Sequence, residues 1–421
     1  MLAADHTGGG GDAPARVAVI GTLDTKGPEI AYVRDRLRTL GVEPVVIDAG
    51  ILGEPVEITP DVGREQVARE GGHTLAQARE SGSRGAAVEI MQAGVRALCR
   101  RLWSEGGLDG VLCLGGAEGA QLGAAGMHAL PLGVPKVILS PSASGRRPFA
   151  PFIGESDVVV MHSVVDILGL NPIARSVYDN AVGAVVGMVR TAGGALGRLE
   201  AGTVGVTMLG QTTPGVNRLW TELVEAGLEP VVFHANGVGG PAMEGLAEQG
   251  ALAGIVDYTI SELANSVMDG IHAVGPDRLR VAGRLGLPQV VVPGCADFFN
   301  QGAPVPDAYR DRPFYYHNPT ATLVRLNRNE MERLGAMVAE RLNGAQGPVR
   351  VLAPTRGFSL AGVSGGALYD PSADDALIGT LERELRCDIE MQRFDLDVND
   401  RRFAVAVAQS FIEMIGRSPV H

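Results

Sequence analysis

Cysteine is scarce in this sequence, and the spacing of the few cysteines argues against the structures that cysteines usually build. Only four occur, at Cys99, Cys113, Cys295 and Cys387, and no two of them form a CxxC pair. A zinc site or a disulfide framework is therefore not expected. We expect all four to be small, buried and inert thiols in a reducing cytoplasm.

Long apolar runs, basic clusters and a targeting segment are also missing. The longest apolar stretch, VVVMHSVVDILGL at 158–170, contains His162 and Asp166 and is too short to cross a bilayer. The formal net charge is −12, whereas a nucleic-acid surface needs clustered lysine and arginine. Residues 1–15 lack the basic and apolar regions of a signal peptide, so we expect a flexible tail there. These absences predict a soluble cytoplasmic protein with no membrane or nucleic-acid partner.

Three common catalytic motifs are absent as well. No HExxH, GxSxG or GxxxxGK[ST] pattern occurs anywhere in the chain. The usual metalloprotease, hydrolase and Walker-type nucleotide sites are therefore disfavoured. Any chemistry has to come from other residues.

What the sequence does contain is an internal duplication. Residues 16–50 resemble residues 203–240, and the pairs Pro28 with Pro214 and Gly41 with Gly227 share one offset of 186 positions. Each copy has the pattern strand, polar loop, helix, strand. A repeat of this length indicates two supersecondary units rather than a solenoid. We therefore expect two lobes, at 16–195 and 196–421, with a ligand-binding cleft between them.

Strands alternate with helices along both halves, which predicts parallel strands joined by right-handed crossovers. The predicted fold class is α/β, with two Rossmann-like doubly wound parallel-sheet lobes. Ligands of such sheets bind at the carboxyl ends of the strands, so the loops that follow the strands are candidate sites. Local signals also predict a short helix starting at Pro60 with Thr59 as its N-cap, and a helical bridge between the lobes within 166–194.

Three loops of the first lobe follow predicted strands and carry residue types that bind phosphate. Glycines let a ligand approach the backbone, a helix start favours an anion, and Lys26 adds a positive charge. The predicted nucleotide-binding set is Gly21, Thr22, Asp24, Thr25, Lys26, Gly115, Gly116, Glu118, Gly119, Ser142, Ser144 and Gly145. The alternative is structural: Asp24 or Thr25 caps a helix, Lys26 is solvated, and the glycines serve tight packing.

The second lobe offers candidate substrate and catalytic residues near its own strand ends. The predicted substrate-binding set is His234, Asn236, Gly237, Gly239, Gly240, Asn300, Asn318 and Arg325. The predicted catalytic residues are Asp297, Glu262 and His317, and Asp297 is also the candidate to hold Mg²⁺ through water. Two of these residues have structural alternatives: His234 as a hydrogen-bonded strand-end histidine, and Glu262 as the partner of Thr259 in a capping box.

Several segments together resemble one family, the Tm-one-like ATP-binding domain proteins, named for a tomato mosaic virus resistance protein. They are GTLDTKGPEI, LPLGVPKVILSPSASG, SVVDILGLN, FHANGVGGPAME, HNPTATLVR and VNDRRFA, spread over nearly the whole chain after the tail. The resemblance implies two Rossmann-like subdomains that bind ATP with Mg²⁺ in a homodimer. Plant relatives append a barrel-like domain, so the resemblance also implies that this chain works alone or with a separate barrel-type partner protein.

The sequence departs from the family pattern at predicted phosphate contacts. The family loop resembles GGSGGT, whereas GGAEGA occurs here, so Ala117 and Ala120 replace two hydroxyls. Glu118 in the same loop would repel a triphosphate. The second copy of the duplication reads GQTTPG and has lost the lysine and the carboxylate of GTLDTKG. We therefore expect the charged end of the ligand on the first lobe.

Three hypotheses about function follow. The leading one is an ATP-binding protein that uses Mg-ATP in a transfer or ligation on a small acidic metabolite, with Lys26 on phosphate and Asp297 on Mg²⁺ or acting as base. The second is a nucleotide or metabolite binding module without turnover, because no recognised pair of nucleophile and base occurs. The third is a site rebuilt for a non-nucleotide substrate, because the loops are altered.

Overall fold

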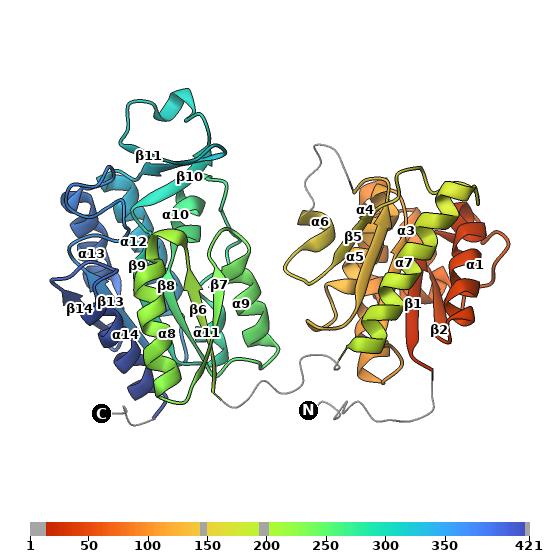
Figure 1. Ribbon diagram of the computed structural model, residues 1–421, viewed down its shortest axis with the longest axis horizontal. Helices are drawn as coiled ribbons and strands as arrows, with labels where there is room; N and C mark the ends of the chain where they lie inside the picture. Colours follow the sequence, from red (N-terminus) through yellow and green to blue (C-terminus); the bar gives the residue numbers. More distant parts are fainter. Residues whose placement is uncertain (1–13, 144–149, 193–201, 417–421) are drawn as a thin grey trace. The chain divides into compact units, whose positions relative to one another are not determined.

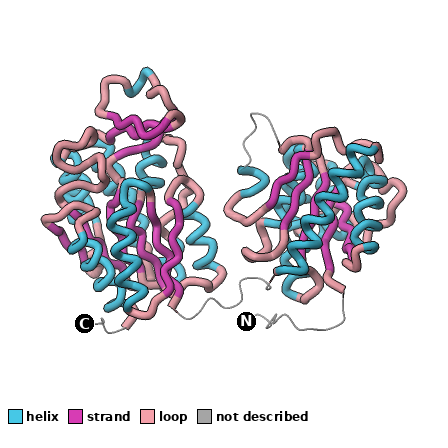
Figure 2. Tube along the Cα trace, in the orientation of Figure 1, coloured by secondary structure: helices cyan, strands magenta, loops and turns pink. Residues whose placement is uncertain are grey.

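The computed structural model describes residues 14–143, 150–192 and 202–416. The chain divides into two compact units, Met1–Gly197 and Arg198–His421 (Figure 1). Most of the predicted tail, and the site candidates Ser144 and Gly145, lie outside the described residues. Each unit is α/β, with strands in the middle and helices on both sides (Figure 2). The cleft between the lobes stays a prediction.

The first unit contains one five-stranded sheet with the order β2-β1-β3-β4-β5, and all of its strand pairs are parallel. Its strands are β1 (Arg16–Gly21), β2 (Glu43–Asp48), β3 (Gly110–Leu114), β4 (Lys136–Ser140) and β5 (Val159–His162). The central strands are buried along almost their whole length, as expected for a parallel sheet covered on both faces. The predicted doubly wound fold is confirmed for this unit.

Two layers of helices cover this sheet. The helices are α1 (Leu23–Thr39), α2 (Arg64–Glu70), α3 (Leu75–Arg79), α4 (Arg84–Ser104), α5 (Ala117–Met127), α6 (Ala150–Ile153) and α7 (Pro172–Thr191). Helices α1 and α7 share one core with Val17 and Val19 of β1. Helices α2 to α5 share the other core with Ala18 and Ile20 of the same strand. The alternation along β1 therefore feeds two separate cores, and α7, predicted as a bridge, packs on the first sheet.

The helix predicted to start at Pro60 begins later, at Arg64 after an extended Gly63. The preceding segment runs beside the edge of β2 instead, because the backbone N–H groups of Asp61 and Val62 donate to Val46 O. The Asp61 carboxylate in turn accepts from Val46 N at 2.7 Å. Edge pairing with β2 thus overrides the local helix signal of Thr59 and Pro60.

The second unit repeats this order and extends it. Its main sheet has the order β14-β13-β9-β8-β6-β7, again with parallel pairs throughout. Its strands are β6 (Thr203–Met208), β7 (Glu229–His234), β8 (Gly254–Thr259), β9 (Gln289–Gly294), β13 (Val349–Pro354) and β14 (Glu390–Phe394). When the strands of each main sheet are numbered from the first one in the unit, the order is 2-1-3-4-5 in the first unit and 2-1-3-4-5-6 in the second, so the duplicated segments occupy equivalent places.

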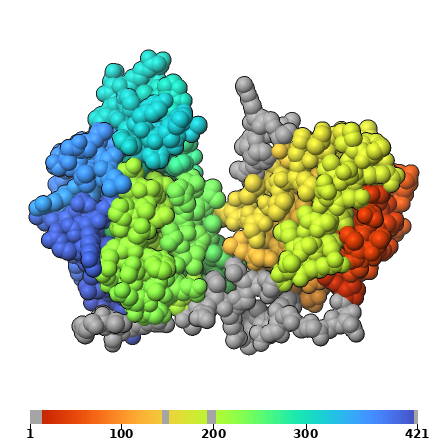
Figure 3. Space-filling model, in the orientation of Figure 1, coloured from red at the N-terminus to blue at the C-terminus, as the bar shows by residue number. Residues whose placement is uncertain are grey.

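The helices of the second unit again form two layers. They are α8 (Thr213–Glu225), α9 (Gly239–Glu248), α10 (Ser261–Met268), α11 (Val281–Leu285), α12 (Arg328–Asn343), α13 (Pro371–Glu384) and α14 (Arg401–Met414). An antiparallel sheet of β10 (Phe298–Gly302), β12 (Ala321–Arg325) and β11 (Phe314–Asn318) is inserted after β9. This insertion, which the sequence did not predict, forms one end of the second unit (Figure 3). None of the helices within the described ranges is long and apolar enough to span a bilayer.

Three of the four cysteines are buried as predicted, but Cys387 is exposed. Burial raises the pKa of the Cys99 and Cys113 thiols to about 12, so both remain protonated and unreactive. Cys387 lies between the end of α13 at Glu384 and the start of β14 at Glu390. The expectation of four buried thiols is therefore wrong at this one position.

Candidate functional site

A pocket of about 650 Å³ lies at the carboxyl ends of β1 and β3 in the first unit. The chain leaves β1 toward the α1 face of the sheet and leaves β3 toward the α5 face. This divergence between neighbouring strands is the topological switch point, where doubly wound sheets bind their ligands. The pocket is lined by Thr22, Asp24, Thr25, Lys26, Ile51, Leu52, Arg79, Ser83, Arg84, Ala87, Gly116, Ala117, Glu118 and Gly119.

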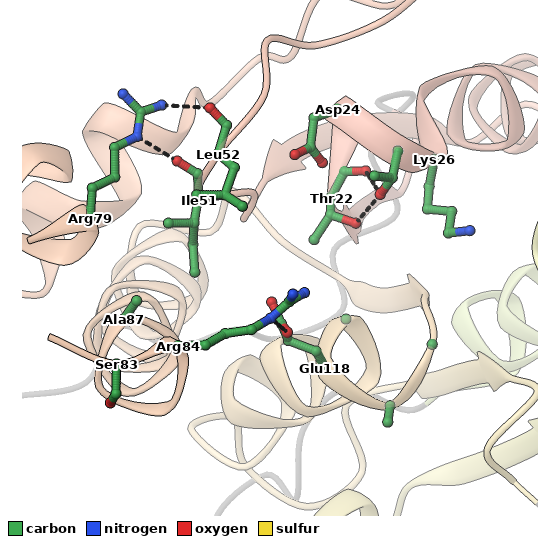
Figure 4. A pocket seen from close by; sticks show the side chains of 14 residues that line it. Thr22, Asp24, Lys26, Ile51, Leu52, Arg79, Ser83, Arg84, Ala87 and Glu118 are labelled. Atoms are coloured by element: carbon green, nitrogen blue, oxygen red, sulfur yellow. Dashed lines mark hydrogen bonds and ion pairs between the residues drawn. The ribbon is translucent and has the colours of Figure 1, made fainter. Parts of the chain in front are cut away.

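Three helices begin at this pocket. The first turn of α1, the N-cap and first residue of α4, and the first turn of α5 all contribute lining residues (Figure 4). Helices α4 and α5 contain 21 and 11 residues, whereas the first turn of the 17-residue α1 is separated from the rest of that helix by a kink at Lys26. The first N–H groups of each helix lack intrahelical partners, and the helix dipole makes that end positive. The pocket thus combines three positive helix ends with the side chains of Lys26, Arg79 and Arg84.

The GTLDTKG loop is held by packing and by hydrogen bonds. A Cβ on Gly27 would lie 1.8 Å from Val56 O, so close packing needs glycine there, whereas a Cβ on Gly21 would meet the end of the Ile30 side chain at 2.8 Å. The hydroxyls of Thr22 and Thr25 are 3.0 Å apart. The two hydroxyls thus lie close together just beyond Gly21, the last residue of β1.

The structural alternative of a side-chain cap on this helix is wrong. Helix α1 has Thr22 as its N-cap, and that residue makes no side-chain cap hydrogen bond. Asp24 instead accepts from Gly53 N at 3.0 Å and so fixes the loop after β2. Leu23 N donates to the buried Asp48 carboxylate at 3.1 Å, and burial raises the pKa of Asp48.

Lys26 lines the pocket and also holds a neighbouring loop. Its ammonium donates to Ile167 O, and Figure 4 shows its side chain extending away from Arg84 and Glu118. An ammonium has three donors, so this contact leaves two for a ligand. The backbone of Lys26 is non-helical within α1, with φ −127° and ψ 15°. The predicted solvated lysine is therefore an anchored one at the pocket wall.

The glycines of the LGGAEGA loop differ in what the fold requires of them. A Cβ on Gly115 would lie 2.7 Å from the Gly119 Cα, so Gly115 permits the strand to pass close to α5. A Cβ on Gly116 would meet nothing within 4 Å, and its φ of −64° suits any residue. Neither packing nor backbone conformation requires glycine at 116, which leaves space for a ligand beside the start of α5.

Arg84 forms an ion pair with Glu118, its Nε lying 2.5 Å from the Glu118 carboxylate. The pair joins the first turn of α4 to the first turn of α5 at the pocket (Figure 4). The Glu118 carboxylate therefore has a partner among the other residues that line the pocket. The positive charge of Arg84 therefore offsets part of the repulsion that is predicted between Glu118 and a triphosphate.

Sequence reasoning missed the part of this pocket that follows β2. Arg79 donates to Ile51 O at 2.7 Å and to Leu52 O at 2.9 Å, so it fixes the backbone of that wall. Ser83 caps α4 by accepting from Ala86 N at 3.1 Å. The sequence contained a signal for Ile51 and Leu52, because the strand ending at Asp48 has its carboxyl end beside that of β1, but it contained none for Arg79 and Ser83. Ser142, by contrast, lies outside the pocket lining, and its N–H donates to Ser140 Oγ at 3.1 Å.

The equivalent switch point of the second unit, between β6 and β8, is filled by the chain itself. Gln211 is 7% exposed, and its side-chain oxygen accepts from Ala361 N at 3.0 Å. Its backbone oxygen accepts from Leu360 N at 3.2 Å and from Asn399 Nδ2 at 3.0 Å. The hydroxyl of Thr212 lies 2.8 Å from that of Thr259. Segments after β13 and β14 thus occupy the place that is open in the first unit.

Glu262 is fully buried and does not form the predicted capping box. Helix α10 has no side-chain cap hydrogen bond at its start. One Glu262 oxygen accepts from Gly237 N and from Gly240 N, both at 3.1 Å. The other accepts from Arg278 Nε at 2.8 Å. Glu262 therefore fixes the glycine loop after β7, and Gly237 and Gly240 hold it in return.

Arg278 connects Glu262 to two more carboxylates, and we call these four residues the Arg278 cluster: Glu244, Asp257, Glu262 and Arg278. The guanidinium lies 2.5 Å from Asp257 and 3.4 Å from Glu244. All four residues are at most 4% exposed. Burial raises the pKa of Glu244 to about 7, because one arginine cannot compensate three buried carboxylates.

Asp297 is also fully buried, and this environment does not suit Mg²⁺. Ser359 donates to one carboxylate oxygen at 2.7 Å, while the other has no hydrogen-bond partner among the described residues. Burial raises the pKa of Asp297. Because Mg²⁺ usually keeps several water ligands, a carboxylate without solvent access does not fit it. The described ranges also contain no group of three or more His, Cys, Asp or Glu that could hold a metal ion.

Arg325 has a structural environment as well. Its Nη1 donates to Asp297 O at 2.8 Å, and its Nη2 lies 2.6 Å from the buried Asp374 carboxylate. Burial raises the pKa of Asp374 to about 7. At the other end of β12, Asn318 pairs with Ala321, so His317 and Asn318 lie about 13 Å along the strand from Arg325. Both are exposed.

The remaining second-unit candidates lie around the end of β7 and in β10. His234 ends β7 and is exposed, Asn236 follows it in the loop before α9, and Gly239 is the first residue of that helix. A Cβ on Gly239 would lie 2.1 Å from His234 O, so this glycine is needed for packing. Asn300 is buried in β10, where its side-chain oxygen accepts from Asn265 Nδ2 at 3.2 Å.

Two family models match this chain. The N-terminal domain of the Uncharacterised protein family (UPF0261) matches residues 15–193, and the C-terminal domain of the same family matches residues 201–415. A UPF0261 protein of Clostridium tetani (strain Massachusetts / E88) is 37% identical, covering 95% of this chain and 99% of that protein. One from Rhizobium meliloti (strain 1021) is also 37% identical, covering 94% of this chain and 98% of that protein.

A plant protein matches over a similar stretch. The ToMV resistance protein Tm-1(GCR237) of Solanum lycopersicum is 34% identical over 435 residues. The match covers 96% of this chain but 56% of the tomato protein. The chain thus spans nearly the whole of the bacterial relatives and about half of the plant one.

Proposed function

This chain belongs to the uncharacterised protein family UPF0261, and we propose that its first unit binds a nucleotide, ATP, through the phosphates. The tomato Tm-1 proteins are among its relatives. The observation that carries the proposal is the meeting of three helix N-termini at one pocket on the switch point. Helix N-termini bind phosphate because their free N–H groups and dipoles face the anion.

The lining residues suit the phosphates at one end of the pocket and the base at the other. Lys26 and the backbone at Gly116 and Gly119 stand where the phosphates would bind, beside the starts of α1 and α5. Ile51 and Leu52 provide apolar surface for a base. A volume of about 650 Å³ is within the range of small-molecule sites. If Mg²⁺ accompanies the nucleotide, Asp24 would hold it rather than the buried Asp297, because Glu118, the other carboxylate among the lining residues, is paired with Arg84.

Titration calorimetry with ATP on the intact chain tests this proposal. We expect saturable binding, and Lys26→Ala weakens it about 10- to 100-fold, the usual effect of losing a charged hydrogen bond. Arg100→Ala, an exposed change on α4 that removes the same charge outside the pocket, serves as the control. Equal affinity of Lys26→Ala and wild type would remove Lys26 from the phosphate site.

An independent measurement uses the scarcity of lysine. Lys26 and Lys136 are the two lysines of the chain, and the Lys136 side chain is 0% exposed in an ion pair with Asp157. An amine acetylating reagent followed by mass spectrometry should therefore modify Lys26, and ATP should slow that reaction. Acetylation of Lys26 at the same rate with and without ATP contradicts the proposal.

A second candidate function is a nucleotide-binding module without turnover. It is favoured by the burial of Asp297 and Glu262, since both hold structural hydrogen bonds and neither reaches solvent as a base. Incubation with Mg-ATP and candidate acidic metabolites separates the two functions. Release of phosphate, ADP or AMP supports a transfer or ligation, whereas stoichiometric binding without release supports the module. A cytoplasmic location, a homodimer and a barrel-type partner stay predictions.

A further inference from the structure

The first turn of α5 carries an anionic side chain at the pocket. Glu118 is the second residue of this helix, its side chain is 30% exposed, and it lines the pocket. A carboxylate at this place interacts favourably with the positive helix end. It therefore occupies the electrostatic environment that a ligand phosphate would seek.

Arg84 reaches this carboxylate from another helix. It is the first residue of α4, its side chain is 76% exposed, and its Nε lies 2.5 Å from Glu118. Both residues line the pocket, and the ion pair connects the two helix ends within it (Figure 4). An exposed arginine of this kind is held weakly, so it can exchange one anionic partner for another. Its planar fork of donors suits phosphate as well as carboxylate.

We propose that Glu118 is a built-in competitor for the phosphate site and that Arg84 exchanges Glu118 for the ligand's phosphates. This inference rests on the proposed nucleotide site and identifies two residues that set its affinity and charge selectivity. Glu118 lowers the affinity for every anionic ligand, and the effect increases with ligand charge. Neutral ligands that use only the apolar wall are unaffected, because like-charge repulsion requires a charge on both groups.

The test measures dissociation constants of the intact chain for ATP, ADP, AMP and adenosine by calorimetry. Glu118→Gln removes the competing charge and keeps the size of the side chain. We expect this variant to bind ATP about 3- to 10-fold more tightly, AMP less so, and adenosine as the wild type does. Glu89→Gln is the matched control, because it removes one exposed carboxylate from α4 outside the pocket lining.

The exchange by Arg84 is tested in a double-mutant cycle. Arg84→Ala should weaken ATP binding about tenfold or more, because it removes a phosphate partner and leaves Glu118 uncompensated. Arg84→Ala/Glu118→Gln should bind ATP more tightly than Arg84→Ala and more weakly than Glu118→Gln. Thermal unfolding of each variant verifies that the fold is intact.

Two kinds of failure are distinguishable. If the wild type binds none of the four ligands, the proposed function fails and this inference fails with it. If the wild type binds ATP but Glu118→Gln weakens or does not change that affinity, only the inference is overturned. A gain in affinity that is equal for ATP and adenosine overturns it as well, because the effect would then not depend on charge.

Discussion

Lysine occurs twice in this chain, although lysine and arginine together number 36. Arginine thus fills nearly every place where the two are interchangeable on a protein surface. Arginine cannot replace lysine where a compact point charge is needed. Lys136 fits that description, since it is enclosed and bound to Asp157 and Pro131 O. Lys26 lies at the pocket wall, and its retention as a lysine agrees with the proposed phosphate contact.

A substitution at Gly116 should change ligand affinity much more than it changes the stability of the fold. Because a Cβ at 116 would meet no protein atom within 4 Å, Gly116→Ala should cost at most about 1 kcal/mol of stability, the usual effect of alanine at an N-cap. The same methyl group would stand where phosphate approaches α5, so ATP affinity should fall about tenfold or more. Calorimetry and urea unfolding measure the two quantities.

Gly27→Ala is the opposite case and serves as the control. Its Cβ would lie 1.8 Å from Val56 O, so this variant should lose stability strongly. A Gly116→Ala variant that binds ATP like the wild type would show that no ligand atom approaches this glycine.

At the scale of elements, the Arg278 cluster connects β8, α9, α10 and the segment before α11. The pKa of Glu244 is raised to about 7 from an ordinary value of 4.5, so the folded state holds a proton that the unfolded state has lost. This contribution to stability is complete below about pH 4.5 and is lost as the pH rises through about 7. The free energy of unfolding of the second unit should therefore decrease over this interval.

Glu244→Gln should reduce that decrease, because glutamine stays neutral at every pH. Urea unfolding at a series of pH values between about 5 and 8 measures the slope, and Glu248→Gln, an exposed change on the same helix, should leave it unchanged. Part of the slope should remain in Glu244→Gln, since burial also raises the pKa of Asp374 to about 7. Identical slopes for Glu244→Gln and the wild type would exclude this origin of the pH dependence.

The elements that the sequence predicts well are those whose signal is repeated or strongly periodic. The buried strand VAVIG and the helix ending before Gly41, whose φ is 74°, form as expected. Predictions failed where a tertiary contact overrides a local signal. Thr59 and Pro60 look like a helix start, but their neighbours pair with β2; Thr259 and Glu262 look like a capping box, but Arg278 binds the glutamate.

The candidate site shows the same division. The loops after β1 and β3 could be predicted to meet, because parallel strands place their carboxyl ends at one edge. The contribution of Arg79 and Arg84 could not be predicted, because it depends on the path that the chain takes after β2 through α3 and α4. Asp297 and Glu262 were predicted at a ligand edge from their positions after strands. Position alone does not reveal burial, and both residues bind partners from distant segments.

At the scale of the whole molecule, the two units share a strand order but differ in what stands at the switch point. Ligand binding should therefore slow hydrogen exchange in one copy of the duplication and not in the other. With ATP present, we expect slower exchange in the segments 22–27, 51–53, 79–87 and 116–120 of the intact chain. The segments 209–213 and 359–361, which Gln211 connects, should exchange at unchanged rates.

Hydrogen exchange followed by mass spectrometry gives all of these rates from one digest. Equal slowing at 209–213 and at 22–27 would contradict a site confined to the first unit. At the same ATP concentration, the variant Lys26→Ala should reduce the slowing in the first unit without altering the second.

Because the switch point of the second unit is filled, that unit serves as an internal control when ligand binding to the intact chain is measured. The second unit repeats the strand order of the first and is measured in the same buffer at the same temperature. Its switch point, however, is occupied by Gln211 and the segment around Ala361. Signals common to both copies therefore report either a change of solution conditions or a site that is not confined to the first unit. The difference between the copies reports the bound molecule, so even weak ligands from a crude metabolite extract can be ranked without a second protein as reference.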